Sequence, residues 1–139
     1  MKPCIQNPRA RCRRGIESIE LLIGLPILLL VVAAGIEYGW VVLRSSQLDH
    51  AARVGARAAA RPDADAASVI ARVNDSLESI GIDNASVEFQ PGVPESIPSG
   101  EVVTVRVVLD YADVDLLGLG GLMPLPDSLV GRAAMVREP

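Results

Sequence analysis

The sequence is poor in aromatic residues and contains a single histidine. Among 139 residues there are one Phe, one Trp and two Tyr, so any soluble core must be built from Val, Leu, Ile and Ala. The lone histidine, His50, has no second histidine with which to bind a metal ion. Its neighbour Asp49 would point about 100° away from it on a helix, so the two side chains indicate no catalytic pair.

Other short patterns also lack the residues that their chemistry requires. Asp110, Asp113 and Asp115 resemble part of a calcium loop, but the glycine and the distal glutamate of that pattern are missing. The glycines at 118, 120 and 121 open no predicted helix and have no nearby lysine, which excludes a phosphate-binding loop. An acidic chain with few aromatics shows no nucleic-acid footprint. We therefore expect a non-enzymatic protein without a cofactor or a metal.

Charge and hydrophobicity are unevenly distributed along the chain. Residues 1–15 hold five basic residues and no acidic one; since the whole chain carries −4, the remainder carries −9. From Leu21 to Leu43 the only charged residue is Glu37. As a helix this run would be about 34 Å long, slightly more than the ~30 Å hydrocarbon core of a bilayer. The pattern predicts one membrane crossing at about 21–43, with the basic N-terminus in the cytoplasm.

Two carboxylates lie at or within this run. Glu20 directly precedes it, at a membrane boundary where a carboxylate without a partner is costly and is therefore a candidate for function. Glu37 lies about 25 Å further along the helix, near the outer interface. The flanking Gly35 and Gly39 form a small-residue face suited to close helix packing. The Glu37 side chain is expected either to reach the interface or to pair with another helix.

A proline inside the run also bears on packing. Pro26 removes a backbone donor and predicts a kink or a loosened turn. In lipid the freed carbonyl must be satisfied by neighbouring structure. Pro26 is compatible with packing against other helices in a filament. It is equally compatible with a proline that a transmembrane helix simply tolerates.

A basic pair, a glycine and a glutamate five residues later precede the apolar run, in Arg13-Arg14-Gly15 and Ile19-Glu20. Further along stand Leu25-Pro26, Gly35-Ile36-Glu37-Tyr38-Gly39 and Ala51-Ala52-Arg53-Val54-Gly55-Ala56-Arg57. The first motif resembles the prepilin signal of type IV pilins. Together, over about Arg13 to Arg61, the motifs resemble the TadE-like family, minor pseudopilins of tight-adherence (Flp) pilus assembly.

This resemblance implies a processed membrane protein with several partners. Prepilin peptidase would cut between Gly15 and Ile16, and Glu20 would pair with the new amine of Ile16 in an adjacent subunit. A lone buried charge is penalised by several kcal/mol whereas a pair is tolerated, so insertion would favour one register. The implied partners are the peptidase, other pseudopilins and pilins, the inner-membrane assembly platform and membrane lipid. The mature chain would lose Cys4 and Cys12, and with them any disulfide.

Two other interpretations of the N-terminal region remain open. A single-pass anchor for a periplasmic binding domain would keep Gly15 uncut. A secreted protein released by an ordinary signal peptidase at Ala34 would be soluble.

For the fold, the sequence predicts an α+β, pilin-like protein with a long N-terminal helix, a second short helix and a three-stranded antiparallel sheet. We expect a leader at 1–15, a long helix at 16–61 and a periplasmic head at 62–139. Pro62 ends the long helix, Asp63 or Asp65 caps the second, and Gly81 stops it. Alternating residues predict strands at 85–90, 101–111 and 129–137.

The long helix carries two further patterns beyond the apolar run. Small and apolar side chains recur on one face; these are Leu48, Ala52, Gly55 and Ala59. We expect this stripe to pack on the protein's own sheet, with contact to neighbouring subunits as the alternative. Arginines follow at a four-residue step at 53, 57 and 61, with Asp49 and Arg53 spaced as an ion pair.

Overall fold

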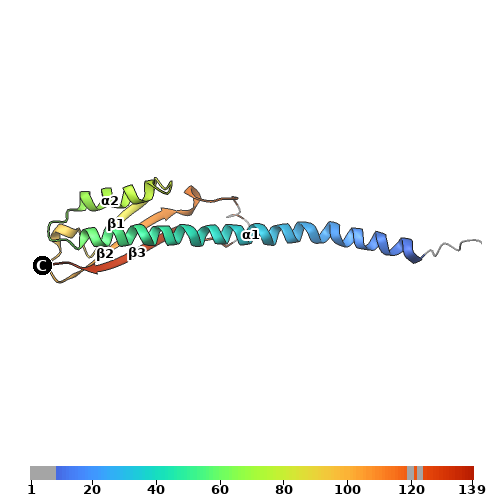
Figure 1. Cartoon of the computed structure of the whole chain (residues 1–139), viewed down its shortest axis with the longest axis horizontal. Helices are drawn as coiled ribbons and strands as arrows, with labels where there is room; N and C mark the ends of the chain where they lie inside the picture. The colour runs from blue at the N-terminus through green and yellow to red at the C-terminus, as the bar shows by residue number, and fades with distance from the viewer. Residues whose placement is uncertain (1–8, 119–120, 122–123) are drawn as a thin grey trace, which may run out of the picture. The chain divides into compact units, whose positions relative to one another are not determined.

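The computed structural model describes residues 9–118, 121 and 124–139, with the side chains of 9–18 excepted. The fold is the predicted long helix, short helix and three-stranded antiparallel sheet (Figure 1). The elements are α1 (Arg9–Ala59), α2 (Ala66–Glu78), β1 (Ser86–Gln90), the 3-10 turn η1 (Pro94–Ser96), β2 (Val102–Asp110), the 3-10 turn η2 (Tyr111–Asp113) and β3 (Ser128–Val136).

The chain divides into two compact units, and the boundary falls within α1. The first unit ends at Ile36 and the second, called the head below, comprises Glu37–Pro139. The head therefore begins inside the predicted span of 21–43 and includes α1 from Glu37 to Ala59. The helix continues through Pro26, which lies in the first unit.

The sheet has the order β1-β2-β3, with both pairings antiparallel. Val105, near the middle of β2, pairs with Phe89 of β1 and with Ala133 of β3. As the alternation predicts, every second side chain of β2 points into the core; these are Val103, Val105, Val107 and Leu109. On the opposite face Arg106 forms an ion pair with Glu88 across the strands, at 3.5 Å.

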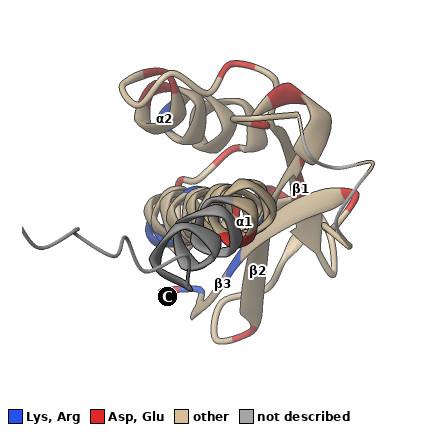
Figure 2. Ribbon diagram, turned by 90° about the vertical axis from the view of Figure 1, so that its right-hand side faces the viewer, with Lys and Arg blue, Asp and Glu red and all other residues tan. Residues whose placement is uncertain are grey.

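Helix α2 and the head portion of α1 cover the buried face of the sheet (Figure 2). The stripe of small residues on α1 is completely buried here, which confirms packing on the protein's own sheet. From α2, Val69, Val73 and Leu77 complete the core. With so few aromatics, the core depends on small side chains that allow the helices and the sheet to approach closely.

Two glycines mark the closest of these approaches. A Cβ at Gly55 of α1 would lie 2.6 Å from Val73 Cγ2 and 3.1 Å from Val105 Cγ1, so a larger residue here would force these side chains of α2 and β2 to shift. A Cβ at Gly131 of β3 would overlap the backbone carbonyl of Leu48. Helix α1 thus lies with its backbone directly against β3.

The ends of α2 follow the sequence prediction. Of the two candidate caps, Asp65 is the N-cap, and its carboxylate accepts a hydrogen bond from Ser68 N at 3.3 Å. After the last turn, Gly81 has a φ of 72°, a left-handed conformation that glycine adopts without strain. The long helix ends at Ala59, three residues before Pro62.

An arginine at the end of β3 closes the far end of the head. The Arg137 side chain is buried and donates hydrogen bonds to the carbonyls of Ile97, at 2.9 Å, and Pro62, at 2.8 Å. The next backbone N–H, that of Glu138, donates to the carbonyl of Ala60 at 2.7 Å. These bonds join the last strand to the end of α1.

Candidate functional site

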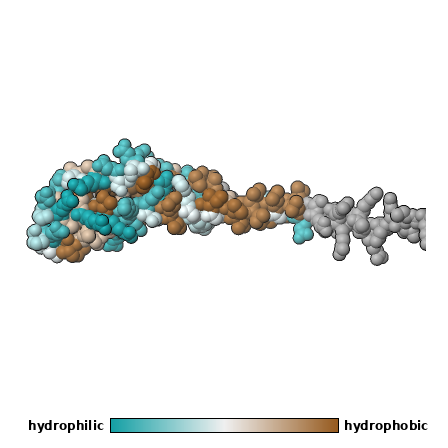
Figure 3. Space-filling model, viewed as in Figure 1, coloured by the Kyte–Doolittle hydropathy of each residue, from teal (hydrophilic) through white to brown (hydrophobic). Residues whose placement is uncertain are grey.

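The first unit presents a helix with a continuous apolar surface. The large side chains from Ile19 to Val32, and Ile36, are exposed, and Figure 3 shows this part of α1 as a hydrophobic surface. Within the described residues, one helix is long and apolar enough to cross a membrane. Such exposure is unfavourable in water, so this length and composition suggest a membrane anchor.

Glu20 lies at the start of this surface and is itself exposed. Among the residues whose side chains are described, none forms a hydrogen bond or an ion pair with its carboxylate. Glu20, Leu21, Gly24, Leu25 and Leu28 line a shallow hollow of about 310 Å³. A Cβ at Gly24 would meet nothing within 4 Å, so the hollow is open. The carboxylate is therefore accessible to a group from another molecule.

The predicted cleavage site lies where the structure describes the backbone alone. Gly15 and Ile16 belong to α1, which begins at Arg9 rather than at the expected residue 16. Their side chains lie outside the described residues, as do residues 1–8 of the expected leader. Cleavage at this bond and the pairing of Glu20 with a new Ile16 amine stay predictions.

The predicted helix-packing glycines have open surroundings. A Cβ at Gly35 or at Gly39 would meet nothing within 4 Å. Neither glycine is used for packing within its own unit, so both remain open for the expected contact with another helix.

Glu37, in contrast, is bound within the head. Its side chain is 0% exposed and accepts hydrogen bonds from the Tyr111 hydroxyl and from the backbone N–H groups of Leu116, at 3.3 Å, and Leu117, at 3.0 Å. Three hydrogen-bond donors of the head therefore surround this carboxylate. The sequence alone had predicted that it would reach the membrane interface or pair with another helix. The loop after β2 is anchored to α1 through this residue.

Two aromatic residues of α1 extend this attachment. The Tyr38 hydroxyl donates to the carbonyl of Pro124 at 3.2 Å, and Trp40 Nε1 donates to the carbonyl of Val114 at 2.7 Å. We call these bonds, together with those of Glu37, the clasp. The Trp40 ring also lies 4.5 Å from the guanidinium of Arg44, which donates to the carbonyl of Ile80 at 3.1 Å.

Tyr111 provides the buried hydroxyl of the clasp. Burial raises the pKa of Tyr111 to about 12, and the hydrogen bond to the Glu37 carboxylate contributes to the same direction. The hydroxyl is consequently protonated, and able to donate, throughout the physiological pH range. Tyr111 closes the predicted strand 101–111 and lies two residues after the buried Leu109, so the alternation is the one sequence signal that points to the clasp.

The arginine stripe on α1 faces solvent. Arg53, Arg57 and Arg61 are exposed. The expected pair of Asp49 with Arg53 does not form. Instead, the Asp49 carboxylate accepts the backbone N–H of Arg132 at 3.1 Å, because β3 lies against this turn of α1 and offers an unpaired edge donor.

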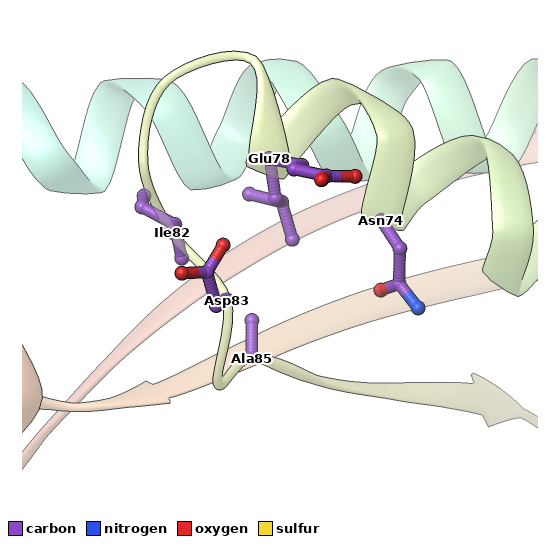
Figure 4. Close-up of a pocket in the computed structure, with 6 residues that line it drawn as sticks. Asn74, Glu78, Ile82, Asp83 and Ala85 are labelled. Atoms are coloured by element: carbon purple, nitrogen blue, oxygen red, sulfur yellow. The ribbon is translucent and has the colours of Figure 1, made fainter.

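A second hollow, beside the end of α2, also contains polar side chains. It has a volume of about 330 Å³ and is lined by Asn74, Glu78, Asp83 and three apolar residues (Figure 4). Within the described part of the chain, no group of three or more His, Cys, Asp or Glu side chains is placed to hold a metal ion. The hollow provides no arrangement that indicates catalysis.

Comparison with known proteins gives one match. Residues 15–57 match the model of the family described as TadE-like protein. The matched segment begins at Gly15, continues through Glu20 and the exposed apolar surface, and ends within the head portion of α1. No curated protein and no solved structure matches the chain.

Proposed function

We propose that this chain, whose residues 15–57 form a TadE-like segment consistent with the Tad/Flp pilus system, acts as a minor pseudopilin in pilus assembly. The family suggests involvement in assembly of the Tad pilus. In this role the chain is cut after Gly15 by prepilin peptidase and has no enzymatic activity of its own. The protein would then remain in the bacterial inner membrane, with its N-terminus cytoplasmic and its head periplasmic, until it joins other pseudopilins and pilins.

The observation that carries this proposal is the carboxylate of Glu20, which is exposed and which no described side chain satisfies. It is exposed at the start of an apolar helix, five residues after the glycine at which the family match begins. A carboxylate in that position is costly in lipid unless a cation reaches it. Removal of the leader would create such a cation, the α-amino group of Ile16, on every subunit.

Processing is tested first by replacing the glycine at the cleavage site. In the wild type we expect mass spectrometry to show a mature chain beginning at Ile16, and in Gly15→Leu a chain that keeps its leader. A larger side chain at this position would obstruct access of the peptidase to the bond. Gly24→Leu is the matched control, because its Cβ would meet nothing within 4 Å, and it should be cut normally.

The mass of the wild-type N-terminus also separates the other two interpretations. An intact leader would indicate an uncut anchor for a periplasmic domain. A start near Gly35 would indicate a secreted protein. Normal cutting of Gly15→Leu would refute the assigned site.

The charge-pairing step is tested by Glu20→Ala. Cutting should continue, because the bond after Gly15 is unchanged, whereas incorporation into the pilus machinery should fall about tenfold or more, as expected when a buried charge loses its partner. Cross-linking of the variant to pilins in cells, compared with wild type, measures this incorporation. Glu20→Asp keeps the charge and should retain much of the yield. Equal incorporation of Glu20→Ala and wild type would rule out pairing through this carboxylate.

A further inference from the structure

The loop after β2 combines exposed leucines with several backbone polar groups that are bonded to α1. Leu116 and Leu117 are 45% and 47% exposed, while their backbone N–H groups donate to the Glu37 carboxylate. On the same loop the carbonyls of Val114 and Pro124 accept bonds from the aromatic side chains of the clasp. In low-dielectric surroundings a loop is tolerated only when its backbone groups are satisfied by protein.

The clasp holds this loop at the N-terminal end of the head portion of α1, beside Glu37. Ile36 is the last residue of the first unit, and Glu37 is bonded directly to the loop. Ile19–Ile36 as a helix is about 27 Å long, close to the ~30 Å hydrocarbon core. If this stretch fills the core, Glu37 lies at its outer edge. Leu116 and Leu117 then lie at the same edge, because their N–H groups are bonded to that carboxylate.

The side chains that follow Ile36 along α1 are of the types found at a membrane interface. Tyr38 and Trp40, the second being the only tryptophan of the chain, follow the apolar stretch directly, and such residues are enriched at headgroup depth. Val42 and Leu43 are also exposed, within about 10 Å of Ile36 along the helix, so they lie near the interfacial layer. An exposed apolar group at this depth avoids water by contacting lipid.

The charges on and around the loop indicate which kind of lipid surface it can enter. From Leu116 to Leu125 the sequence has no ionisable residue, and Asp113, Asp115 and Asp127 flank it. Acidic flanks would be repelled by anionic headgroups, whereas the uncharged Leu116 and Leu117 can enter a zwitterionic interface without that penalty.

From these observations we infer that Leu116 and Leu117 insert into the outer interface of the membrane that α1 crosses, and give the head a second lipid contact. The membrane span is then Ile19–Ile36, and the clasp holds the inserted loop at its edge. The inference rests on the membrane anchoring in the proposed function and does not depend on cutting at Gly15.

Site-specific fluorescence on the full chain in phosphatidylcholine vesicles tests the inserted loop. An environment-sensitive dye is attached at Leu117→Cys in a chain with Cys4→Ser and Cys12→Ser, at about one chain per vesicle. Nitroxide lipids labelled near the glycerol region should quench this dye about twofold more than a dye at Ser96→Cys, because that exposed control lies beyond β1 at the far end of the head. Aqueous iodide should show the reverse order.

A third dye position separates failure of the loop from failure of the span. A dye at Leu29→Cys, within the apolar stretch, should be quenched by lipids with a nitroxide deep in the acyl chain. Quenching at 29 with water-like behaviour at 117 would overturn the inference alone, and water-like behaviour at both would overturn the membrane span as well. Protection of 117 that appears only at several chains per vesicle would assign the leucines to a second copy and would also overturn it.

Discussion

Replacing Gly131 with valine is expected to destabilise the head by about 3 kcal/mol or more, near or above the upper end for overpacked cores. The side chain would begin where the carbonyl of Leu48 lies, so it collides with helix backbone that has no rotamer to change. Relief requires α1 to move away from β3. That movement would also break the hydrogen bond from Arg132 N to the Asp49 carboxylate.

Urea unfolding of the full chain in detergent micelles, followed by the fluorescence of Trp40, measures this loss. Gly39→Ala is the matched control on α1. A Cβ there meets nothing within 4 Å, and replacing an interior helix glycine by alanine should stabilise by up to about 1 kcal/mol. An unfolding midpoint of Gly131→Val equal to that of wild type would contradict the close packing of α1 on β3.

Replacing Glu37 with alanine is expected to release the loop after β2. The substitution removes the acceptor of three hydrogen bonds and leaves the buried hydroxyl of Tyr111 without its carboxylate partner. The buried hydroxyl left unsatisfied costs about 1–3 kcal/mol and each of the two lost backbone hydrogen bonds about 0.5–1.5 kcal/mol, so a loss of about 3 kcal/mol is expected. The emission of Trp40 should shift to the red as its contact with Val114 loosens.

Hydrogen exchange locates the effect of Glu37→Ala within the loop. The amides of Leu116 and Leu117 should exchange much faster than in wild type, while those of the central strand β2 keep most of their protection. Glu88→Ala is the control, because this exposed carboxylate pairs with Arg106 on the solvent face and its loss should change stability by less than about 1 kcal/mol. Unchanged exchange at 116 and 117 would be incompatible with the clasp.

The architecture of the head follows from periodic signals in the sequence. The alternation over 101–111 predicts β2 to within one residue at each end, since one face of the strand is packed and the other is solvated. The small stripe on α1 is buried as predicted because only such residues let the helix approach the sheet. Pro62 and Gly81 act locally, so the C-terminal ends of the two helices were also predictable.

The clasp has no comparable periodic signal. Its loop lacks a repeating pattern, and its bonds join residues 74 to 86 positions apart in sequence. The sequence therefore predicted that Glu37 would reach the interface or pair with another helix, whereas three hydrogen-bond donors of its own head surround its carboxylate. The same holds for Arg137, whose burial depends on carbonyls from two distant loops. Glu20 differs from both, since no described side chain satisfies it.

The contacts between α1 and the rest of the head have a mechanical consequence. They are distributed along the helix, from Glu37 at its entry to Ala59 at its end, with Leu48 against β3 between them. A pulling force that enters the head at Glu37 along this helix therefore acts on many contacts at once. The contacts are sheared in parallel and do not break one after another. Resistance to such a force depends on the unfolding rate rather than on equilibrium stability, and the proposed pseudopilin role, in which the chain is drawn out of lipid intact, would require that resistance.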